Sequence, residues 1–272
     1  ETRLHLFGKL RYTIAMLDKR TQRIATKAVL AAGKHVAQHY GKLEAADFTL
    51  KKKHERVTKV DIDSNNMIIR QLVKYFPNDD ILSEESPLSD KPGTRRWVID
   101  PIDGTSNFIA HIPLFAVSLA LMHDADVIWS MTYAPILNEK FIAAEDDGVT
   151  LNGKSVHVSS RPSVAGSMLA YGYSHEPSSK KRSFHAMERF SDHASSMRHL
   201  GSASLELAYV ACGRFDASIF FAPLNIWDVA GGVLQVKEAG GAITQHDGKS
   251  WTPDSATLVA SNKKMHVEIL QK

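Results

Sequence analysis

The sequence predicts a layered α/β protein, and two observations carry this prediction. In the second half of the chain, helical and strand-like patterns alternate, which is typical of helices packed on sheets. In the first half, a long helical pattern is followed by several short β-rich runs. With 272 residues, the chain is long enough for one large domain or for two packed subdomains with a sizeable core.

The first half is predicted to contain two helices and a set of short strands. Apolar residues at helical spacing favour a helix over residues 18–40, and Gly41 would end it. A second helix is expected to follow Asp61 and to close at residues 77–80. Residues 57–60 are expected to be a short strand or an extended entry, and 81–82 are a two-residue apolar stub before paired acids. The β-rich runs that predict strands are 97–99, 114–122, 127–133, 140–144 and 149–158.

The second half is predicted to alternate between strands and helices. Residues 161–163 (Arg-Pro-Ser) favour a turn, so we expect two halves, 1–160 and 161–272. The polar segment 173–182 is expected to be a loop. Strands are expected at 167–173, 217–221, 240–244 and 257–260, with helices at 182–196, 202–212 and 227–239.

Composition restricts the class of protein. A net charge of +3 is too small to favour a nucleic-acid partner, which would require a clustered basic face. No stretch approaches the roughly 20 apolar residues that span a bilayer, so we expect no membrane partner. The single cysteine, Cys212, allows no internal disulfide, and we expect a cytoplasmic protein. Because Met16 resembles a start residue, residues 1–15 are expected to be an upstream extension.

Residues 94–108 hold the pattern that carries most chemical information. Asp100 and Asp103 follow the apolar run 97–99, and Pro101 is expected to end that strand because it lacks an N–H group. A glycine and small polar residues then favour a turn and a helix start. Carboxylates bind Mg²⁺, and N–H groups at a helix start bind phosphate. For an isolated D-x-x-D-G pattern, a turn in which the aspartates bind their own backbone is the more common explanation.

Three further segments change this interpretation. They are VTKVD at 57–61, SEES at 83–86 and NIWDVAGG at 225–232, and they accompany DPIDGT at 100–105. Together, in this order and spacing, the four segments resemble the inositol monophosphatase family of Mg²⁺-dependent, lithium-sensitive phosphatases. The resemblance covers residues 18–270, and the DPIDGT and WDVAGG strings are its two signatures.

The resemblance implies a role for each matching residue. Glu84, Asp100 and the carbonyl of Ile102 would bind a first metal ion, and Asp100, Asp103 and Asp228 a second. Glu84 would also contact a third ion through water. Asp61 and Thr105 would orient and deprotonate the attacking water. The substrate would be bound by Asp103, the N–H groups of Gly104 and Thr105, and the small-residue loop formed by Gly201, Ser202 and Ala203.

The resemblance also implies a fold and a reaction. The fold would have five layers, α-β-α-β-α, with the site between the two halves. The half 1–160 would carry most metal ligands, and 161–272 would supply Asp228 and the loops on the substrate side. A small phosphorylated substrate would be hydrolysed by direct attack of a metal-activated water, with two or three Mg²⁺ ions or Mn²⁺ in their place. Family members are commonly homodimers.

The chain departs from the family pattern at the residues that would contact the substrate. Ser83 replaces the usual glycine before the paired glutamates. Phe220 and Phe221 stand where inositol-specific members place a glutamate that binds a ring hydroxyl. Leaving such a buried polar group without its partner costs roughly 1–3 kcal/mol, which weakens the prediction of myo-inositol phosphate as substrate. The cations of 180–182 would reach a second phosphate or acidic group, although such loop cations are usually only solvated.

Several functions therefore stay open. The leading prediction is a phosphomonoesterase for a small polyol or sugar phosphate of the inositol-1-phosphate type. The alternatives within enzymes are fructose-1,6-bisphosphatase, 3′-phosphoadenosine nucleotide phosphatase and histidinol-phosphate phosphatase. A regulatory scaffold in transcription antitermination is the alternative from another class. A scaffold alone would have no need to keep five carboxylates in register, so the sequence favours catalysis.

Overall fold

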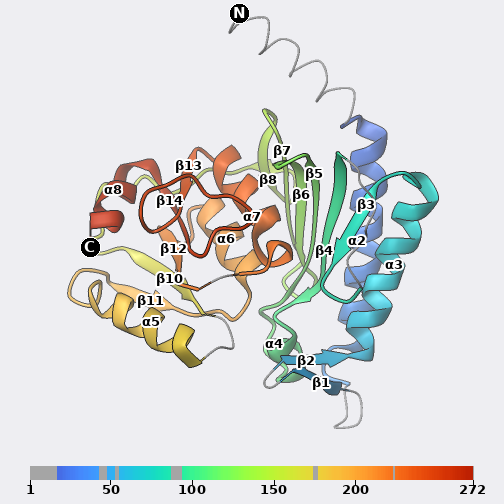
Figure 1. Ribbon diagram of the computed structural model, residues 1–272, viewed down its shortest axis with the longest axis horizontal. Helices are drawn as coiled ribbons and strands as arrows, with labels where there is room; N and C mark the ends of the chain where they lie inside the picture. Colours follow the sequence, from blue (N-terminus) through green and yellow to red (C-terminus); the bar gives the residue numbers. More distant parts are fainter. Residues whose placement is uncertain are drawn as a thin grey trace, which may run out of the picture.

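The structure is a computed structural model, which describes residues 17–42, 48–52, 55–86, 94–173, 177–222 and 224–271 (Figure 1). The expected extension 1–15 lies outside these residues. The described elements form five layers, α-β-α-β-α, which confirms the fold that the sequence predicts. No helix in the described ranges is both long enough and apolar enough to cross a membrane.

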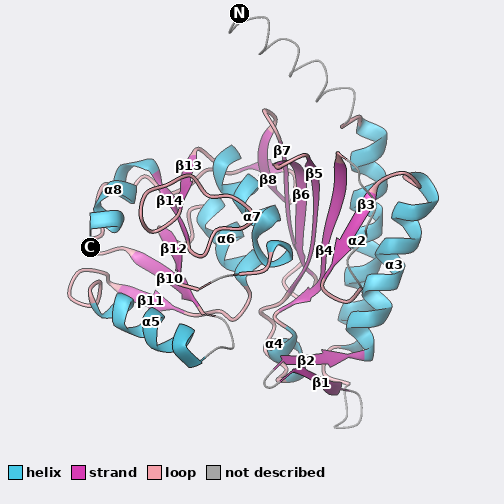
Figure 2. Cartoon of the chain, viewed as in Figure 1, coloured by secondary structure: helices cyan, strands magenta, loops and turns pink. Residues whose placement is uncertain are grey.

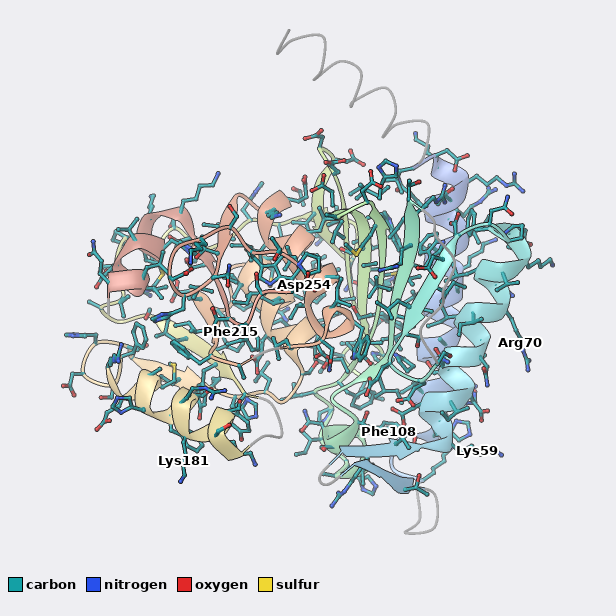
Figure 3. The ribbon with its side chains drawn as sticks, viewed as in Figure 1. Lys59, Arg70, Phe108, Lys181, Phe215 and Asp254 are labelled. Atoms are coloured by element: carbon teal, nitrogen blue, oxygen red, sulfur yellow. The ribbon has the colours of Figure 1, made fainter. Side chains whose placement is uncertain are left out.

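Two long helices form the first layer. Helix α2 (Lys19–His39) begins after Asp18, whose carboxylate accepts the N–H of Thr21 at 2.6 Å and so caps the helix. Helix α3 (Lys59–Tyr75) begins with a capping box formed by Thr58 and Asp61. Both helices place their apolar faces on the first sheet, where Phe108 belongs to the same core (Figure 3).

The first sheet has seven strands in the order β3-β4-β5-β6-β7-β8-β9. Only β3 and β4 run parallel, and the remaining neighbours are antiparallel. A separate hairpin, β1–β2, precedes α3. The bounds are β1 Phe48–Lys52, β2 Glu55–Thr58, β3 Asp80–Ser83, β4 Arg95–Asp103, β5 Ala116–His123, β6 Asp126–Ala134, β7 Glu139–Ala144, β8 Gly148–Leu151 and β9 Lys154–Ser155.

Helices α6 (Ala203–Ala211) and α7 (Ile226–Glu238) lie between the two sheets (Figure 2). Both are apolar on nearly all sides, as expected for helices buried in a central layer. A Cβ at Gly232 would lie 2.4 Å from the Cβ of Leu207, so this glycine allows α6 and α7 to pack closely. The carbonyl of Gly231 accepts the Ser130 hydroxyl at 3.0 Å, which ties α7 to β6.

The second sheet has five strands in the order β11-β10-β12-β14-β13. Helices α5 (Pro177–Glu188) and α8 (Lys263–Gln271) cover its outer face, and α6 and α7 its inner face, where Phe215 is part of the core (Figure 3). The strand bounds are β10 Met168–Gly172, β11 Ser196–Arg198, β12 Ala217–Phe220, β13 Gly241–Thr244 and β14 Leu258–Asn262. The division into 1–160 and 161–272 stays a prediction.

Three predicted boundaries were wrong. Strand β4 continues to Asp103, because Pro101 lies in a bulge between the pairs Asp100–Ser118 and Asp103–Ala116 and interrupts no ladder bond. The run 57–60 is not one strand, since α3 starts at Lys59. The polar segment 177–182 belongs to α5, which ends at Glu188 and not at residue 196. The terminal helix α8 and the strand β1 were not predicted.

Candidate active site

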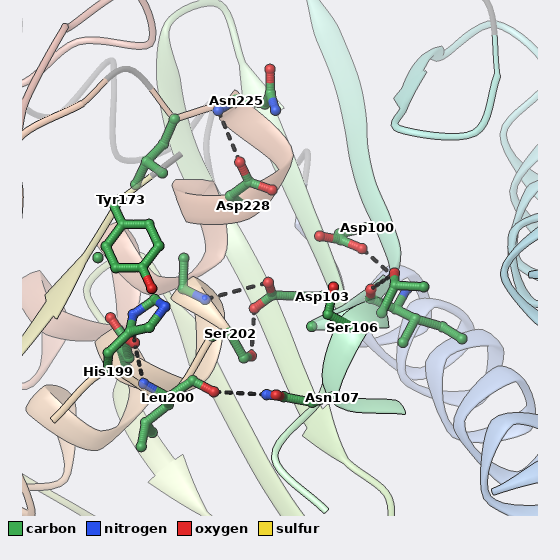
Figure 4. Close-up of a pocket in the computed structure, with 18 of the residues that line it drawn as sticks. Asp100, Asp103, Ser106, Asn107, Tyr173, His199, Leu200, Ser202, Asn225 and Asp228 are labelled. Atoms are coloured by element: carbon green, nitrogen blue, oxygen red, sulfur yellow. Dashed lines mark hydrogen bonds and ion pairs between the residues drawn. The ribbon is translucent and has the colours of Figure 1, made fainter. Parts of the chain in front are cut away.

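A cavity of about 430 Å³ opens between the end of β4 and the first turns of α6 and α7 (Figure 4). Its lining residues come from both sheets and from the central helices. Every site residue predicted from the sequence lines it except Asp61: Glu84, Asp100, Ile102, Asp103, Gly104, Thr105, Gly201, Ser202, Ala203 and Asp228. The fold thus brings together residues that lie up to 144 positions apart, from Glu84 to Asp228.

Three carboxylates converge at one end of this cavity. Asp100 and Asp103 lie at the end of β4 and Asp228 in the first turn of α7, each with an oxygen within 4.8 Å of the others. Figure 4 shows the three side chains facing a common space. Burial raises the pKa of Asp100 well above its usual value, and the charges of Glu84, Asp103 and Asp228 raise it further. A group of acids that repel one another in this way suits a bound divalent cation.

The capping of α7 explains the position of Asp228. Its Oδ2 accepts the N–H of Asn225 at 2.9 Å, which closes a capping box at the start of the helix. Burial raises the pKa of Asp228, and the negative charges of Asp103 and Glu84 add to the shift. The same residue therefore starts a helix and completes the acidic cluster.

Hydrogen bonds to Asp103 leave one of its oxygens less engaged than the other. Its Oδ2 accepts the Ser202 hydroxyl at 2.6 Å and both the N–H, at 2.7 Å, and the hydroxyl of Ser204. Its Oδ1 accepts only the longer bond from the Ala203 N–H, at 3.3 Å. Oδ1 is therefore the oxygen better placed to bind a cation. Burial raises the pKa of Asp103, whereas these four hydrogen bonds lower it.

Gly104 makes the sharp turn from β4 into the short helix α4 (Thr105–Ile109). Its φ of 91° is a left-handed conformation that favours glycine. A Cβ here would also lie 3.1 Å from the carbonyl oxygens of both Gly201 and Leu114. The turn therefore requires glycine for conformation and for close approach of the two halves of the site.

Asp61 lies behind the cavity and reaches it through Thr105. The Thr105 hydroxyl lies 3.0 Å from Asp61 Oδ1 and 2.9 Å from the carbonyl oxygen of Ile102. The other carboxylate oxygen of Asp61 accepts the N–H of Thr58 at 2.8 Å. Burial raises the pKa of Asp61 to about 6, while the hydrogen bonds from Thr58 and Thr105 oppose this shift. The carboxylate is thus poised to exchange a proton near neutral pH.

Glu84 and Ile102 complete the predicted metal ligands. Glu84 follows β3, and its N–H donates to the carbonyl of Ile99 at 3.2 Å, which places it beside β4. Its charge contributes to the raised pKa of Asp100, although it is not one of the three converging carboxylates. Ile102 lines the cavity, and its carbonyl accepts the Thr105 hydroxyl.

The opposite end of the cavity is mainly aromatic and apolar. Phe220 and Leu224 line it together with Tyr173 and His199, whose ring centroids lie 4.2 Å apart. Lys180 also lines it, with its ammonium group 5.3 Å from the centre of the Tyr173 ring. Of the two phenylalanines that replace the family glutamate, only Phe220 lines the cavity, so no carboxylate stands at that position.

Sequence reasoning missed several lining residues, of which Glu206 and Asn107 matter most for the geometry. Glu206, in the first turn of α6, is 1% exposed and lines the cavity. Asn107, in α4, donates from Nδ2 to the carbonyls of Leu114 at 2.6 Å and Leu200 at 2.7 Å. A glutamate within the otherwise apolar run 205–211 is the signal that could have revealed Glu206, since buried acids need a structural reason.

Comparisons with known proteins agree with this geometry. The Nus factor SuhB of Xylella fastidiosa is 36% identical over 261 residues, which cover 92% of each chain. The fructose-1,6-bisphosphatase/inositol-1-monophosphatase of Thermotoga maritima is 36% identical over 215 residues, 79% of this chain and 81% of the relative. The crystal structure of the extragenic suppressor protein SuhB of Bartonella henselae has a TM-score of 0.88 at 30% identity, covering 93% of this chain and 98% of that one.

The match to a family model extends over nearly the whole chain. It covers residues 18–272, which include both halves of the cavity and all four motif segments. The two signature strings supply Asp100, Asp103 and Asp228, the three acids that converge in the structure. The chain is a member of the inositol monophosphatase family.

Proposed function

We propose that this protein is a Mg²⁺-dependent phosphomonoesterase that hydrolyses a small polyol or sugar phosphate, of the inositol-1-phosphate type. One observation carries the proposal: Asp100, Asp103 and Asp228 converge within 4.8 Å, and the Asp61–Thr105 pair stands beside them. Such a site offers cation ligands and a proton acceptor at one end of a cavity. Membership of a family of phosphatases supports the same conclusion.

The residues present suit a hard divalent cation. All the side-chain donors are carboxylate oxygens, which Mg²⁺ prefers, and their mutual repulsion is relieved when a cation binds. Glu84, Asp100 and the Ile102 carbonyl would hold one ion, Asp100, Asp103 and Asp228 a second, and Glu84 a third through water. Mn²⁺ would substitute for Mg²⁺. When bound, the ions supply the Lewis acidity that lowers the pKa of water and neutralises charge on the phosphate.

The protein groups then position the water and accept its proton. The Thr105 hydroxyl, 3.0 Å from Asp61 Oδ1, would orient a water for attack on phosphorus while the ester oxygen leaves on the opposite side. A proton from that water passes through Thr105 to Asp61, whose pKa of about 6 leaves it ionised at neutral pH. The N–H groups of Gly104 and Thr105 would bind the phosphate oxygens. No covalent phosphoryl-enzyme is needed.

The part of the cavity that would hold the alcohol of the substrate suits a small leaving group. Its residues say less about which alcohol that is. Gly201, Ser202 and Ala203 line the cavity between the acids and the aromatic end, where they would contact the alcohol. Phe220 offers no hydrogen bond to a ring hydroxyl. Lys180 lies where a second anionic group of the substrate would reach it, which keeps fructose bisphosphate and the 3′-phosphoadenosine nucleotides as alternatives. Histidinol phosphate remains a further alternative.

A second candidate function comes from the relatives. Several of them, including the protein of Xylella fastidiosa, bear the name Nus factor SuhB. A role as a scaffold in transcription antitermination, with protein or RNA partners, would be compatible with an intact phosphatase site. A homodimer would suit either role. Light scattering of the purified protein would test this, because it measures the mass of the particle in solution.

The experiment is phosphate release from a substrate panel. The panel contains inositol-1-phosphate, fructose-1,6-bisphosphate, a 3′-phosphoadenosine nucleotide and histidinol phosphate, each with 5 to 10 mM Mg²⁺ (roughly saturating for weak sites) or with EDTA. We expect Mg²⁺-dependent release from at least one monoester. Absence of release from every substrate, with binding of antitermination factors by the Asp100→Asn variant, would favour the scaffold.

A further inference from the structure

Glu206 is a buried acid that the proposed reaction does not use. Its carboxylate accepts the N–H of Leu200 at 2.8 Å, and the N–H of Gly201 also donates to it. The Ser218 hydroxyl is a more distant partner at 3.5 Å. Both backbone hydrogen bonds therefore come from the turn that precedes α6, and the side-chain neighbour His199 places its Nδ1 3.7 Å from Glu206 Oε1.

The same turn is held from the opposite side by Asn107. The Asn107 amide donates to the carbonyl of Leu200 at 2.7 Å (Figure 4) and to that of Leu114 at 2.6 Å. Gly201 has a φ of 74°, and a Cβ on it would lie 3.3 Å from the Asn107 amide. The turn 200–202 is thus held between a residue of α4 on one side and Glu206 on the other.

This turn leads directly into the groups that hold Asp103. Ser202 is the cap residue of α6, yet its side chain makes no capping bond within the helix and donates to Asp103 instead. The N–H groups of Ala203 and Ser204, which begin α6, donate to the same carboxylate. Asp103, from the other half of the cavity, therefore caps α6 in place of Ser202.

We propose that Glu206 is a positioning residue: by binding the N–H groups of Leu200 and Gly201, it fixes the turn that orients Asp103 for cation binding. The inference rests on the proposed function, in which Asp103 is a metal ligand. Asp103 has one oxygen occupied by three hydrogen bonds, so the direction of Oδ1 depends on where the turn places Ser202 and Ser204. Mutation of a residue that orients a metal ligand in this way typically weakens metal binding by about 10- to 100-fold.

The nature of the contact predicts which substitutions are tolerated. Glutamine has the shape of glutamate and keeps one carbonyl oxygen, so Glu206→Gln retains acceptors for the turn. Leucine fills a similar volume without any acceptor, and Glu206→Leu leaves the N–H groups of Leu200 and Gly201 without their partner. Ser218→Ala is the matched control, because it removes a contact of Glu206 that does not involve the turn.

The test measures Mn²⁺ binding to the full chain by electron paramagnetic resonance, which detects free Mn²⁺ independently of turnover. We expect Glu206→Gln and Ser218→Ala to bind within threefold of the wild type, and Glu206→Leu to bind about 10-fold or more weakly. In phosphate release, the Mg²⁺ concentration for half-maximal rate should rise for Glu206→Leu, while the rate at saturating Mg²⁺ recovers most of its value. Circular dichroism at the assay temperature shows which variants are folded.

Asn107→Ala provides a second variant if Glu206→Leu does not fold. It frees the turn from the opposite side and is expected to weaken Mn²⁺ binding to a similar degree. The inference would be overturned if folded Glu206→Leu bound Mn²⁺ as tightly as the wild type. If Glu206→Leu does not fold, the same result for folded Asn107→Ala would overturn it. If the wild type itself bound no Mn²⁺, the proposed metal-dependent function would be wrong. If the wild type bound Mn²⁺ and the variants bound it equally well, only the role of Glu206 would be wrong.

Discussion

The two ends of the cavity are built differently. At the acidic end, each carboxylate of the converging cluster has an oxygen fixed by backbone N–H groups: Asp100 by Ile102, Asp103 by Ser204, and Asp228 by Asn225. At the other end, the lining includes the rings of Tyr173, His199 and Phe220, with Leu224, Lys180 and the buried Glu206 beside them. The first arrangement sets directions for a cation and a phosphate, whereas the second mainly sets the shape of a space.

This contrast suggests that the reaction and the choice of substrate are encoded separately. A reaction that needs charge stabilisation depends on oxygens held at fixed positions. Discrimination by an apolar wall depends on fit, and small changes there are worth only about 1–3 kcal/mol. Substitutions at the acidic end should therefore lower kcat strongly, and substitutions at the aromatic end should mainly change KM.

Asp100→Asn should give the largest effect. Asp100 is one of the three converging carboxylates, and its replacement removes a ligand that both proposed ions share. We expect kcat for Mg²⁺-dependent phosphate release to fall by about a thousandfold or more, because several kcal/mol of charge stabilisation are lost. Asp254→Asn, at an exposed position, is the control. Full turnover by Asp100→Asn would show that the acidic end does not carry the reaction.

Thr105→Val should give the next largest effect. The variant removes the hydroxyl that connects Asp61 to the cavity and keeps a similar volume. We expect a loss of about 10²-fold in kcat, the contribution typical of a general base. In the wild type, kcat/KM should fall as pH drops through about 6, because Asp61 then takes up a proton. An acid limb that persists unchanged in a residually active Thr105→Val would argue against this pair.

Lys180→Ala tests the aromatic end. For a monoester without a second charge, we expect KM to change by less than about threefold and kcat to stay the same, since an exposed cation contributes little. For a substrate with a second phosphate, KM should rise by about tenfold. The comparison of initial rates on both substrates separates the two cases. A kcat loss as large as that of Thr105→Val would remove the distinction between the two ends.

The smallest effect concerns stability. Burial raises the pKa of Glu206 from 4.5 to about 8, so the folded protein binds a proton that the unfolded chain releases above pH 4.5. Its contribution to stability is therefore lost as pH rises from about 4.5 to 8. In EDTA, we expect the melting temperature of the wild type to fall more steeply over this range than that of Glu206→Gln. Parallel curves for the two proteins would contradict the pKa shift.

The acidic end was largely predictable from the sequence, because its residues belong to short local motifs. Asp100 and Asp103 follow a strand within three positions, and Asp228 starts a helix, so each motif sets its own geometry. The apolar run around Glu206 marks it as unusual, but the roles of Glu206 and Asn107 could not be predicted, since both bind the backbone of a turn that exists only in the folded chain. Asn107 reaches the turn from the first half, and Glu206 binds it from within the second half.

Two errors in the predicted elements have physical causes. The sequence pattern predicts a loop for the first part of α5 because the buried residues of this helix include the polar Ser179 and Ser183. The Ser183 hydroxyl donates to the carbonyl of Gly172 at 3.0 Å, which allows its burial. Strand β4 was ended too early because a bulge accommodates Pro101. A tertiary hydrogen bond explains the first error, and an irregular strand pairing explains the second.

The most direct test of the central claim is anomalous diffraction from a crystal soaked with Mn²⁺. If the cavity is a catalytic metal centre, an anomalous peak should lie within about 2.0–2.4 Å of carboxylate oxygens of Asp100 and of Asp103 or Asp228. The same peak should be absent from Asp100→Asn. A crystal of the wild type that shows no peak at these residues, or a peak elsewhere only, would contradict the account.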